Sequence, residues 1–303
     1  MLAPDILLGD CVESMRSLPS GFVHTCVTSP PYFGLRDYGH EGQIGLEETP
    51  DAYVARLVEV FREVRRVLRD DGTLWLNLGD SYATGTKADR QASTGKLANH
   101  RAQDVGRIGT PEGLKTKDLI GIPWRVAFAL QADGWYLRSE IIWHKPNPMP
   151  ESVTDRPTKA HEQIFLLSKS PRYYYDHEAV KEASVEFAKT PDRRRGAPGV
   201  RKGVSDPFVQ GVTCGGVTPR RNRRSVWTVA TRPYKGAHFA VFPPALVEPC
   251  ILAGAPEWGI VLDPFGGSGT TGMVAHKHNR ASILCELNPE YAALIPDRVA
   301  GGY

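Results

Sequence analysis

A glycine-rich loop near the carboxyl end of the chain could hold a nucleotide-like ligand. It reads Asp263-Pro264-Phe265-Gly266-Gly267-Ser268-Gly269-Thr270-Thr271 and lies between an apolar run typical of a strand and a run with helical spacing. Glycines at such a place let the backbone approach a ligand closely and expose amide groups at the start of a helix. Glu286 ends the next expected strand, 23 residues past Asp263, where nucleotide-binding α/β folds hold ribose hydroxyls.

The spacing within this loop excludes two common nucleotide-binding motifs. The dehydrogenase pattern G-x-G-x-x-G is absent because the glycines are residues 266, 267 and 269, and no P-loop Lys precedes Thr270 or Thr271. Asp263 lies just before the glycines, where its charge would repel a phosphate but attract the amino group of a nucleoside that carries an amino acid. This points to S-adenosylmethionine, and a purely structural tight turn is the alternative.

A second loop, Thr28-Ser29-Pro30-Pro31-Tyr32, directly follows a strand expected at 22–27, and its prolines end that strand. Methylation of an exocyclic amine is difficult because the lone pair of the nitrogen is delocalised into the ring. The Ser29 hydroxyl and the Pro30 carbonyl could accept both amino hydrogens and draw the nitrogen towards tetrahedral geometry. Tyr32 offers a face on which an extruded base can stack. The alternative is a structural loop, as most Pro-Pro-Tyr sequences are.

Alternating strands and helices must position these two loops. Apolar runs predict strands at 6–8, 22–27, 73–78, 136–143, 164–168, 259–262 and 281–285, and helical spacing predicts helices at 11–18, 51–69, 123–132, 244–253 and 270–276. This pattern indicates an α/β fold with a mostly parallel sheet and helices on both faces. Residues 80–117 have few apolar anchors and are expected to form a long mobile loop. Residues 176–235 interrupt the alternation as an inserted module.

Composition excludes several classes of protein. The 303 residues are 23% charged and 41% hydrophobic, as in an ordinary protein with a sizeable core. Five cysteines without a close pair argue against a disulfide scaffold and against a zinc site, and they suit a reducing cytoplasm. The amino-terminal segment is not typical of a signal peptide, and apolar runs are too short for a membrane span.

The net charge of +3 conceals one basic segment. Residues 189–235 contain 12 Lys and Arg against 2 Asp, which gives +10, so the rest of the chain sums to −7. A weakly acidic body with a concentrated basic segment is the electrostatic pattern of a nucleic-acid binder. A solvated, disordered arm is the alternative.

Taken together, the two loops resemble the amino-directed, S-adenosylmethionine-dependent DNA methyltransferases, which modify cytosine-N4 or adenine-N6. The catalytic loop of that family reads (S/N/D)-P-P-(Y/F), and its cofactor loop reads D-x-F-x-G-(S/T)-G-T-T. Here the catalytic loop comes first, the cofactor loop lies near the carboxyl end and a variable segment separates them. That order resembles the β group of the family. The resemblance implies a Rossmann-like methyltransferase sheet with an inserted basic target recognition region.

The resemblance assigns roles to individual residues. The catalytic loop is matched by Ser29, Pro30, Pro31 and Tyr32. The cofactor site is matched by a segment beside the adenine, a motif that walls in the methionine end, the glycine loop and a ribose-binding acid, namely Asp10, Cys11, His238, Phe239, Asp263, Pro264, Phe265, Gly266, Gly267, Ser268, Gly269, Thr270, Thr271 and Glu286. The candidates for contacts with DNA are the clustered arginines of the insert, Arg193, Arg194, Arg195, Arg220, Arg221, Arg223 and Arg224. No metal is expected.

The implied organisation is a catalytic part at 1–175, a target recognition insert at 176–235 and a cofactor-binding part at 236–303. His144, Asn147 and residues 79–82 are weaker candidates for the wall of the base pocket.

The expected function is transfer of a methyl group from S-adenosylmethionine to a flipped base in double-stranded DNA. Ser29 favours cytosine-N4, since Asp or Asn is usual at that position in adenine-N6 enzymes. Adenine-N6, a glutamine side-chain amide and an inactive DNA-binding regulator stay open as alternatives, although the basic insert speaks against a protein substrate. A bacterial or phage-infected cytoplasm is expected, and a cognate restriction endonuclease and a homodimer are open.

Overall fold

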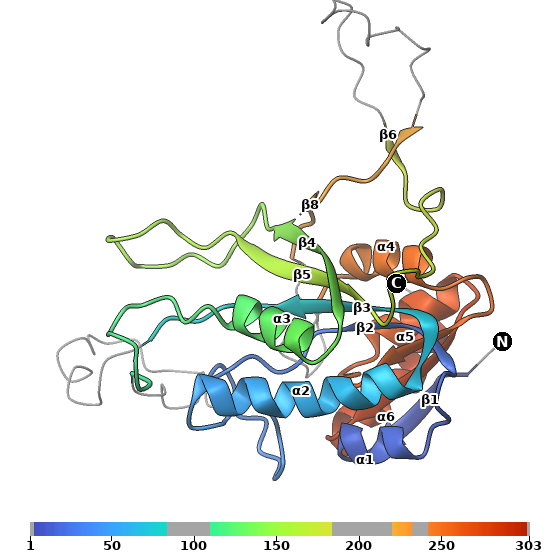
Figure 1. The fold of residues 1–303 in the computed structure, drawn as a ribbon, viewed down its shortest axis with the longest axis horizontal. Coiled ribbons are helices and arrows are strands. Elements are labelled where there is room, and N and C mark those ends of the chain that lie inside the picture. The colour runs from blue at the N-terminus through green and yellow to red at the C-terminus, as the bar shows by residue number, and fades with distance from the viewer. Residues whose placement is uncertain (1–2, 84–109, 184–219, 232–241, 302–303) are drawn as a thin grey trace, which may run out of the picture. The chain divides into compact units, whose positions relative to one another are not determined.

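The computed structural model describes residues 3–83, 110–183, 220–231 and 242–301 (Figure 1). The strands are β1 (Asp5–Leu8), β2 (Val23–Thr28), β3 (Leu68–Leu78), β4 (Tyr136–His144), β5 (His161–Ser168), β6 (Glu182–Ala183), β7 (Arg220–Arg221), β8 (Val226–Thr228), β9 (Ile260–Asp263) and β10 (Ala281–Glu286). The helices are α1 (Cys11–Arg16), α2 (Pro50–Val67), α3 (Ile122–Ala132), α4 (Pro244–Gly254), α5 (Thr270–Lys277) and α6 (Pro289–Gly301).

The described residues group into two compact units, one of Met1–Asp176 with Ser225–Tyr303 and one of His177–Arg224. In the larger unit, eight strands form one sheet in the order β1-β10-β9-β2-β3-β5-β4-β8. Every neighbouring pair is parallel except the two that involve β5, which runs antiparallel to β3 and to β4. The expected mostly parallel, Rossmann-like sheet is therefore confirmed, and its one reversed strand is β5, the third strand from the β8 side.

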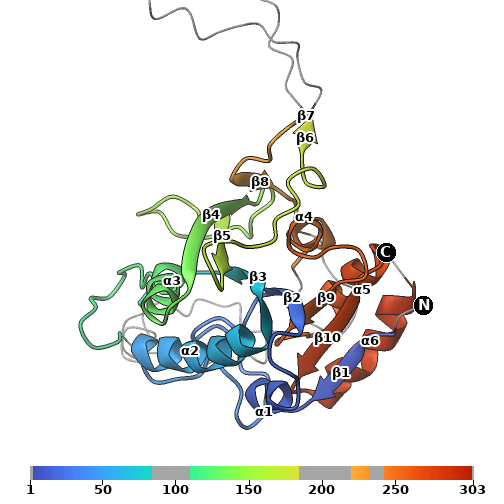
Figure 2. The same cartoon turned by 45° about the vertical axis from the view of Figure 1, so that its right-hand side comes forward.

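Helices cover both faces of this sheet (Figure 2). α1, α2 and α3 pack against one another on one face, and α4, α5 and α6 pack in the same way on the other. Local sequence signals explain where α2 begins. The Thr49 side chain accepts a hydrogen bond from the Ala52 amide at 3.1 Å, and Pro50 suits the first turn of a helix. Its apolar side chains recur at helical spacing and are buried, among them Leu57, Phe61 and Val64.

The smaller unit contains a short antiparallel pair of strands, β6 and β7, in which Glu182 lies opposite Arg221. Among the described residues, no helix is long and apolar enough to cross a membrane. The same residues contain no cluster of three or more His, Cys, Asp or Glu that could hold a metal ion.

Candidate active site

The two loops expected to do chemistry emerge at one edge of the sheet. β2 runs into the loop that begins with Ser29, and β9 ends at Asp263, where the glycine loop begins. β2 and β9 are paired neighbours in the sheet, so both loops leave the same edge side by side. Because β5 runs in the opposite direction, its first residues, His161 and Glu162, lie at this edge as well.

The backbone of the catalytic loop is fixed from α2. The Tyr53 hydroxyl donates a hydrogen bond to the Pro31 carbonyl at 2.8 Å, and the Tyr53 ring lies 5.6 Å from that of Phe33. Tyr53 is fully buried. The loop thus rests on a helix of the core, and its prolines restrict the backbone further.

A network of side chains surrounds the hydroxyl of Tyr32. This hydroxyl donates to Glu162 Oε2 at 2.6 Å and accepts from Asn77 Nδ2 at 2.7 Å. Asn77 Nδ2 also lies 3.2 Å from Ser29 Oγ and 2.9 Å from Glu162 Oε2, and Ser29 Oγ donates to the Tyr32 hydroxyl at 3.3 Å. Lys145 forms an ion pair with the other carboxylate oxygen of Glu162.

The ring of Tyr32 packs directly on Gly79 at the end of β3. A Cβ atom at residue 79 would lie 2.5 Å from Cε2 and 2.8 Å from Cδ2 of that ring, so any other residue would force the ring to move. Burial raises the pKa of Tyr32 well above its ordinary value, and the charge of Glu162 raises it further. The hydroxyl therefore stays protonated and remains a donor.

Asn77, Lys145 and Glu162 are members of this network that sequence reasoning missed. Asn77 interrupts the apolar residues of the run TLWLNL, which opens with Thr73, and it is only 3% exposed. Glu162 precedes the apolar run of β5. A buried polar residue inside an apolar strand was the available signal, because such a group needs hydrogen-bond partners.

The other weaker pocket candidates make structural contacts. Asp80 Oδ1 accepts hydrogen bonds from the amides of Gly121 and Ile122, each at 3.0 Å, at the start of α3. His144 contacts Thr228 at 3.1 Å. Asn147 exchanges hydrogen bonds with the backbone of residue 231. These contacts fix the start of α3 to the segment after β3 and join the ends of β4 and β8.

The ends of the segment expected to be a loop at 80–117 are held together. Tyr82 and Leu119 form an antiparallel bridge, and the amide of Ala83 donates to the Asp118 carbonyl at 2.8 Å. Residues 84–109 lie outside the described part of the chain.

In the cofactor loop, Asp263 is almost completely buried, with 1% of its surface exposed. Its Oδ1 accepts from the Thr28 hydroxyl at 2.6 Å and the Phe265 amide at 3.0 Å, and its Oδ2 accepts from the Thr271 hydroxyl at 2.6 Å. Burial raises the pKa of Asp263. These contacts indicate that Asp263 ties the two loops together through Thr28, a role that differs from the attraction of a ligand amino group expected from sequence.

The glycines of the loop shape its turn. Gly267 and Gly269 have φ angles of 52° and 87°, which favour glycine, and a Cβ at Gly269 would lie 3.0 Å from Ile295 of α6. Glu286 Oε2 accepts from the Gly267 amide at 2.7 Å. Ser268 is hydrogen-bonded to Arg298 of α6. The loop is thus fixed from β10 on one side and from α6 on the other.

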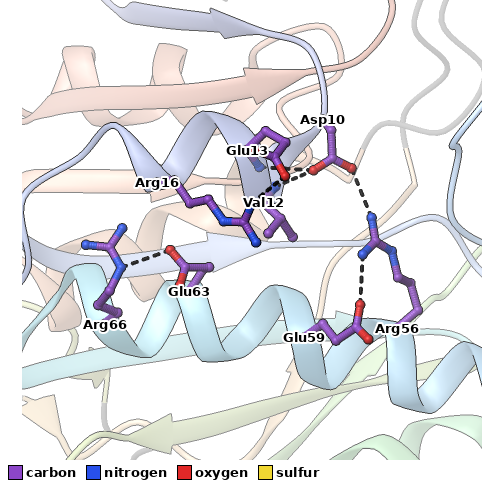
Figure 3. A network of polar contacts seen from close by, with 8 residues as sticks. All are labelled: Asp10, Val12, Glu13, Arg16, Arg56, Glu59, Glu63 and Arg66. Carbon is purple, nitrogen blue, oxygen red and sulfur yellow. Dashed lines mark hydrogen bonds and ion pairs between the residues drawn. The ribbon is translucent and has the colours of Figure 1, made fainter.

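Asp10 lies at the start of α1, beside an open cleft between α1 and α2 (Figure 3). Its Oδ1 accepts from the Val12 and Glu13 amides at 2.9 and 3.1 Å, and its Oδ2 pairs with Arg56 at 3.0 Å. Asp10 is therefore a helix cap and an ion-pair partner. Neighbouring Cys11 is buried, and burial raises the pKa of its thiol to about 12.

Comparison with known proteins shows the family of this chain. The DNA methylase family model matches residues 23–297. The chain belongs to this family. The Type II methyltransferase M.SmaI from Serratia marcescens is 50% identical to it over 297 residues, which cover 97% of this chain and 90% of that protein.

Two solved structures share the fold of this methylase. The PvuII DNA methyltransferase (cytosine-N4-specific) has a TM-score of 0.65 at 19% identity and covers 96% of this chain and 84% of that one. The modification methylase TTHA0409 from Thermus thermophilus, complexed with S-adenosylmethionine, has a TM-score of 0.60 at 23% identity and covers 98% and 93%.

The glycine loop of the methylase fits the cofactor expected from sequence. α5 begins at Thr270, and its N-cap residue Gly269 has no side chain to cap it, so the amides of the first turn are not taken up by a capping side chain. A Cβ at Gly266 would lie 3.0 Å from Leu284, so the loop packs closely against β10. An open helix start beside a close-packed glycine turn is the kind of cradle that a nucleoside with an amino-acid tail needs.

Several expected site residues of the methylase lie outside the described residues, namely His238, Phe239, Arg193, Arg194 and Arg195. In the smaller unit, Arg221 and Arg224 both pair with Glu182, each at 2.9 Å, and Arg220 donates to the Lys181 carbonyl at 3.0 Å. The role of these arginines, and that of Arg223, in binding DNA stays a prediction.

Proposed function

We propose that this DNA methyltransferase transfers a methyl group to the N4 amine of cytosine in double-stranded DNA. The observation that carries the proposal is Ser29, which opens the Ser-Pro-Pro-Tyr loop and lies within the hydrogen-bonded network at the edge of the sheet. The structural neighbour with a TM-score of 0.65 carries the name cytosine-N4-specific, which supports the same choice. The methyl donor is S-adenosylmethionine, whose sulfonium supplies an already activated methyl group.

The residues of the chain act by positioning. Ser29 Oγ and the Pro30 carbonyl accept the two amino hydrogens of the target base, which localises the nitrogen lone pair. The ring of Tyr32 gives the extruded base a stacking surface. No covalent intermediate with the protein is needed, so the rate enhancement comes from orientation and from fixed dipoles.

In the cofactor half of the site, we assign Phe265 and the closely packed glycine turn at 266–269 to the contact with the donor. Each carboxylate oxygen of Glu286 accepts one hydrogen bond, from the Gly267 or the Asn288 amide. Its remaining lone pairs accept hydrogen bonds from the ribose hydroxyls. We assign Asp10 and Cys11 to the adenine end of the donor, and the resemblance assigns His238 and Phe239, outside the described residues, to its methionine end.

The basic segment at 189–235 would hold the phosphates and read the recognition sequence. The order of the two motifs supports membership of the β group. The partner that this function implies is a restriction endonuclease with the same recognition sequence, because Type II methyltransferases are among the curated relatives.

The test is product identification. The protein is incubated with labelled S-adenosylmethionine and genomic DNA free of modified bases, and the digested nucleosides are separated by mass spectrometry. We expect N4-methylcytosine. N6-methyladenine would overturn the choice of base while leaving the catalytic loop intact, and the absence of any methylated nucleoside would overturn the proposed activity.

Two variants test the catalytic loop itself. Ser29→Ala and Tyr32→Ala should each lower the transfer rate by about 100-fold or more, while the affinity for S-adenosylmethionine stays within about twofold. Glu248→Gln is a matched control, since Glu248 pairs with His278 and Lys277 on the surface. Wild-type rates in both loop variants would refute the assignment.

A further inference from the structure

We propose that Glu162 is a positioning residue for methyl transfer, which orients the hydroxyl groups of Tyr32 and Ser29 so that Ser29 presents a free lone pair to the target amine. The proposal rests on the assignment of the Ser-Pro-Pro-Tyr loop as catalytic. It concerns a residue from β5, 130 positions away from Tyr32 in the sequence.

The direction of the hydrogen bonds carries the argument. An ionised carboxylate only accepts hydrogen bonds, so Tyr32 must donate its single proton to Glu162 Oε2 at 2.6 Å. The Tyr32 oxygen is then an acceptor for Ser29 Oγ at 3.3 Å. Each hydroxyl therefore donates towards Glu162, and Ser29 Oγ keeps its lone pairs for accepting, one from Asn77 Nδ2 at 3.2 Å and one from the target amine.

Asn77 reinforces this direction. Its Nδ2 group donates towards Ser29 Oγ, the Tyr32 oxygen and Glu162 Oε2 at 3.2, 2.7 and 2.9 Å. An amide NH₂ has only two protons, so it shares them among three acceptors. Were Glu162 to become a donor, both Asn77 and Tyr32 would face it with protons, and the set would have to rearrange.

Lys145 holds the carboxylate in place. The side chains of Lys145 and Glu162 are 18% and 14% exposed. Lys145 directly follows β4, which pairs with β5 so that Trp143 lies opposite Glu162. The ammonium of Lys145 also lies 4.3 Å from the centre of the Trp143 ring. A largely buried ion pair with a second anchor of this kind is geometrically restrained. It assigns Oε1 of Glu162 to Lys145 and Oε2 to the catalytic loop.

The isosteric variant Glu162→Gln separates direction from packing. Its oxygen must face the Lys145 ammonium, so its NH₂ group faces Tyr32 and Asn77 as a donor. We expect kcat to fall by about 10- to 100-fold, with KM for S-adenosylmethionine within about twofold and an unchanged thermal midpoint. Wild-type kcat in this variant would overturn the proposal.

Two double variants test the mechanism. In a Tyr32→Phe background the hydroxyl relay is absent, so Glu162→Gln should lower kcat by less than about threefold. In Glu162→Gln/Lys145→Met the amide is free to turn its oxygen back to Tyr32, and kcat should recover by about fivefold or more over Glu162→Gln. The same fold-loss in both backgrounds, or no recovery, would overturn the proposal.

Glu248→Gln again serves as the control, because its carboxylate likewise accepts from a lysine, at 3.1 Å, and from a second side chain. If Glu162→Gln does not fold, Glu162→Asp keeps the charge beside Lys145 but withdraws the oxygen from Tyr32, and the same loss of kcat is expected. The kcat of each variant is compared with that of the wild-type protein, whose methylated base is identified first. A failure of the proposed function would appear there as a missing or different methylated base, independently of the Glu162 variants.

Discussion

The cofactor loop and the catalytic loop lie side by side at one edge of the sheet but are held in opposite ways. The cofactor loop is one contiguous segment whose amides donate to two carboxylates, Asp263 at its start and Glu286 of the neighbouring strand β10. The catalytic loop depends on side chains from three distant strands, Asn77 of β3, Lys145 at the end of β4 and Glu162 of β5.

The two loops differ in their sensitivity to distant substitutions. A loop with a glycine-determined turn and carboxylate acceptors for its amides keeps its shape unless a glycine or one of those acids is changed. A loop fixed by side chains from elsewhere loses its geometry when any of those strands changes, even if its own residues are untouched. Substitutions that disturb the cofactor loop should change stability and cofactor binding together. Substitutions that disturb the catalytic loop should change the rate of methyl transfer alone.

Asp263→Ala should produce the largest effect, and it belongs to the cofactor loop. It leaves the Thr28 and Thr271 hydroxyls and the Phe265 amide without their acceptor in a buried site. Each such loss costs about 1–3 kcal/mol, partly offset by removal of a buried charge, so the free energy of unfolding should fall by about 3–5 kcal/mol. Chemical denaturation measures this.

Asp263→Asn is the control for that variant. Its oxygen still accepts from Thr28 and Phe265, and Thr271 can donate instead to the Val27 carbonyl, 3.4 Å away. A loss of about 1 kcal/mol is expected. Equal stability of the Ala variant and the wild type would show that Asp263 does not tie the loops together.

Gly79→Ala should produce the next largest effect, on the catalytic loop. The new methyl group would lie 2.5 Å from the Tyr32 ring, which must then move away from its network. We expect a loss of about 100-fold in kcat, equivalent to about 2.7 kcal/mol, with S-adenosylmethionine affinity unchanged. Gly301→Ala, with no atom near the added methyl group, is the matched control. A parallel fall in cofactor affinity would contradict the separation of the two loops.

The contiguous features of the fold were predictable from sequence. The strands and helices at 22–27, 51–69, 123–132 and 244–253 are confirmed within a few residues. α6 was missed, although Asn288 accepts from the Glu290 amide at 2.8 Å and Pro289 opens the helix, which is a typical start signal. The internal Pro296 obscured the helical pattern after it.

The reversal of β5 could not be predicted, because an apolar run has the same pattern in either direction. With β5 taken as parallel, Glu162 would lie at the edge opposite the catalytic loop, so it was not a candidate. Asp263 was placed correctly in its loop, but its partners Thr28 and Thr271 could not be assigned, since the first of these contacts joins residues 235 positions apart. Side-chain contacts across the sheet require the strand order, which the sequence pattern does not contain.

The smallest expected effect is a pH dependence that isolates Asp263. Because burial raises its pKa, the folded protein binds this proton at pH values where the unfolded chain has released it. Between the ordinary value, about pH 4, and the raised one, the free energy of unfolding of the wild type should therefore fall as the pH rises. Asp263→Asn lacks this group, so the difference in stability between wild type and variant should decrease over that range while other carboxyl groups cancel. Denaturant titrations at a series of pH values measure it. A difference that increases with pH would mean that the hydrogen bonds from Thr28, Thr271 and Phe265 outweigh burial, and that the cofactor loop is stabilised by the charge of its buried acid.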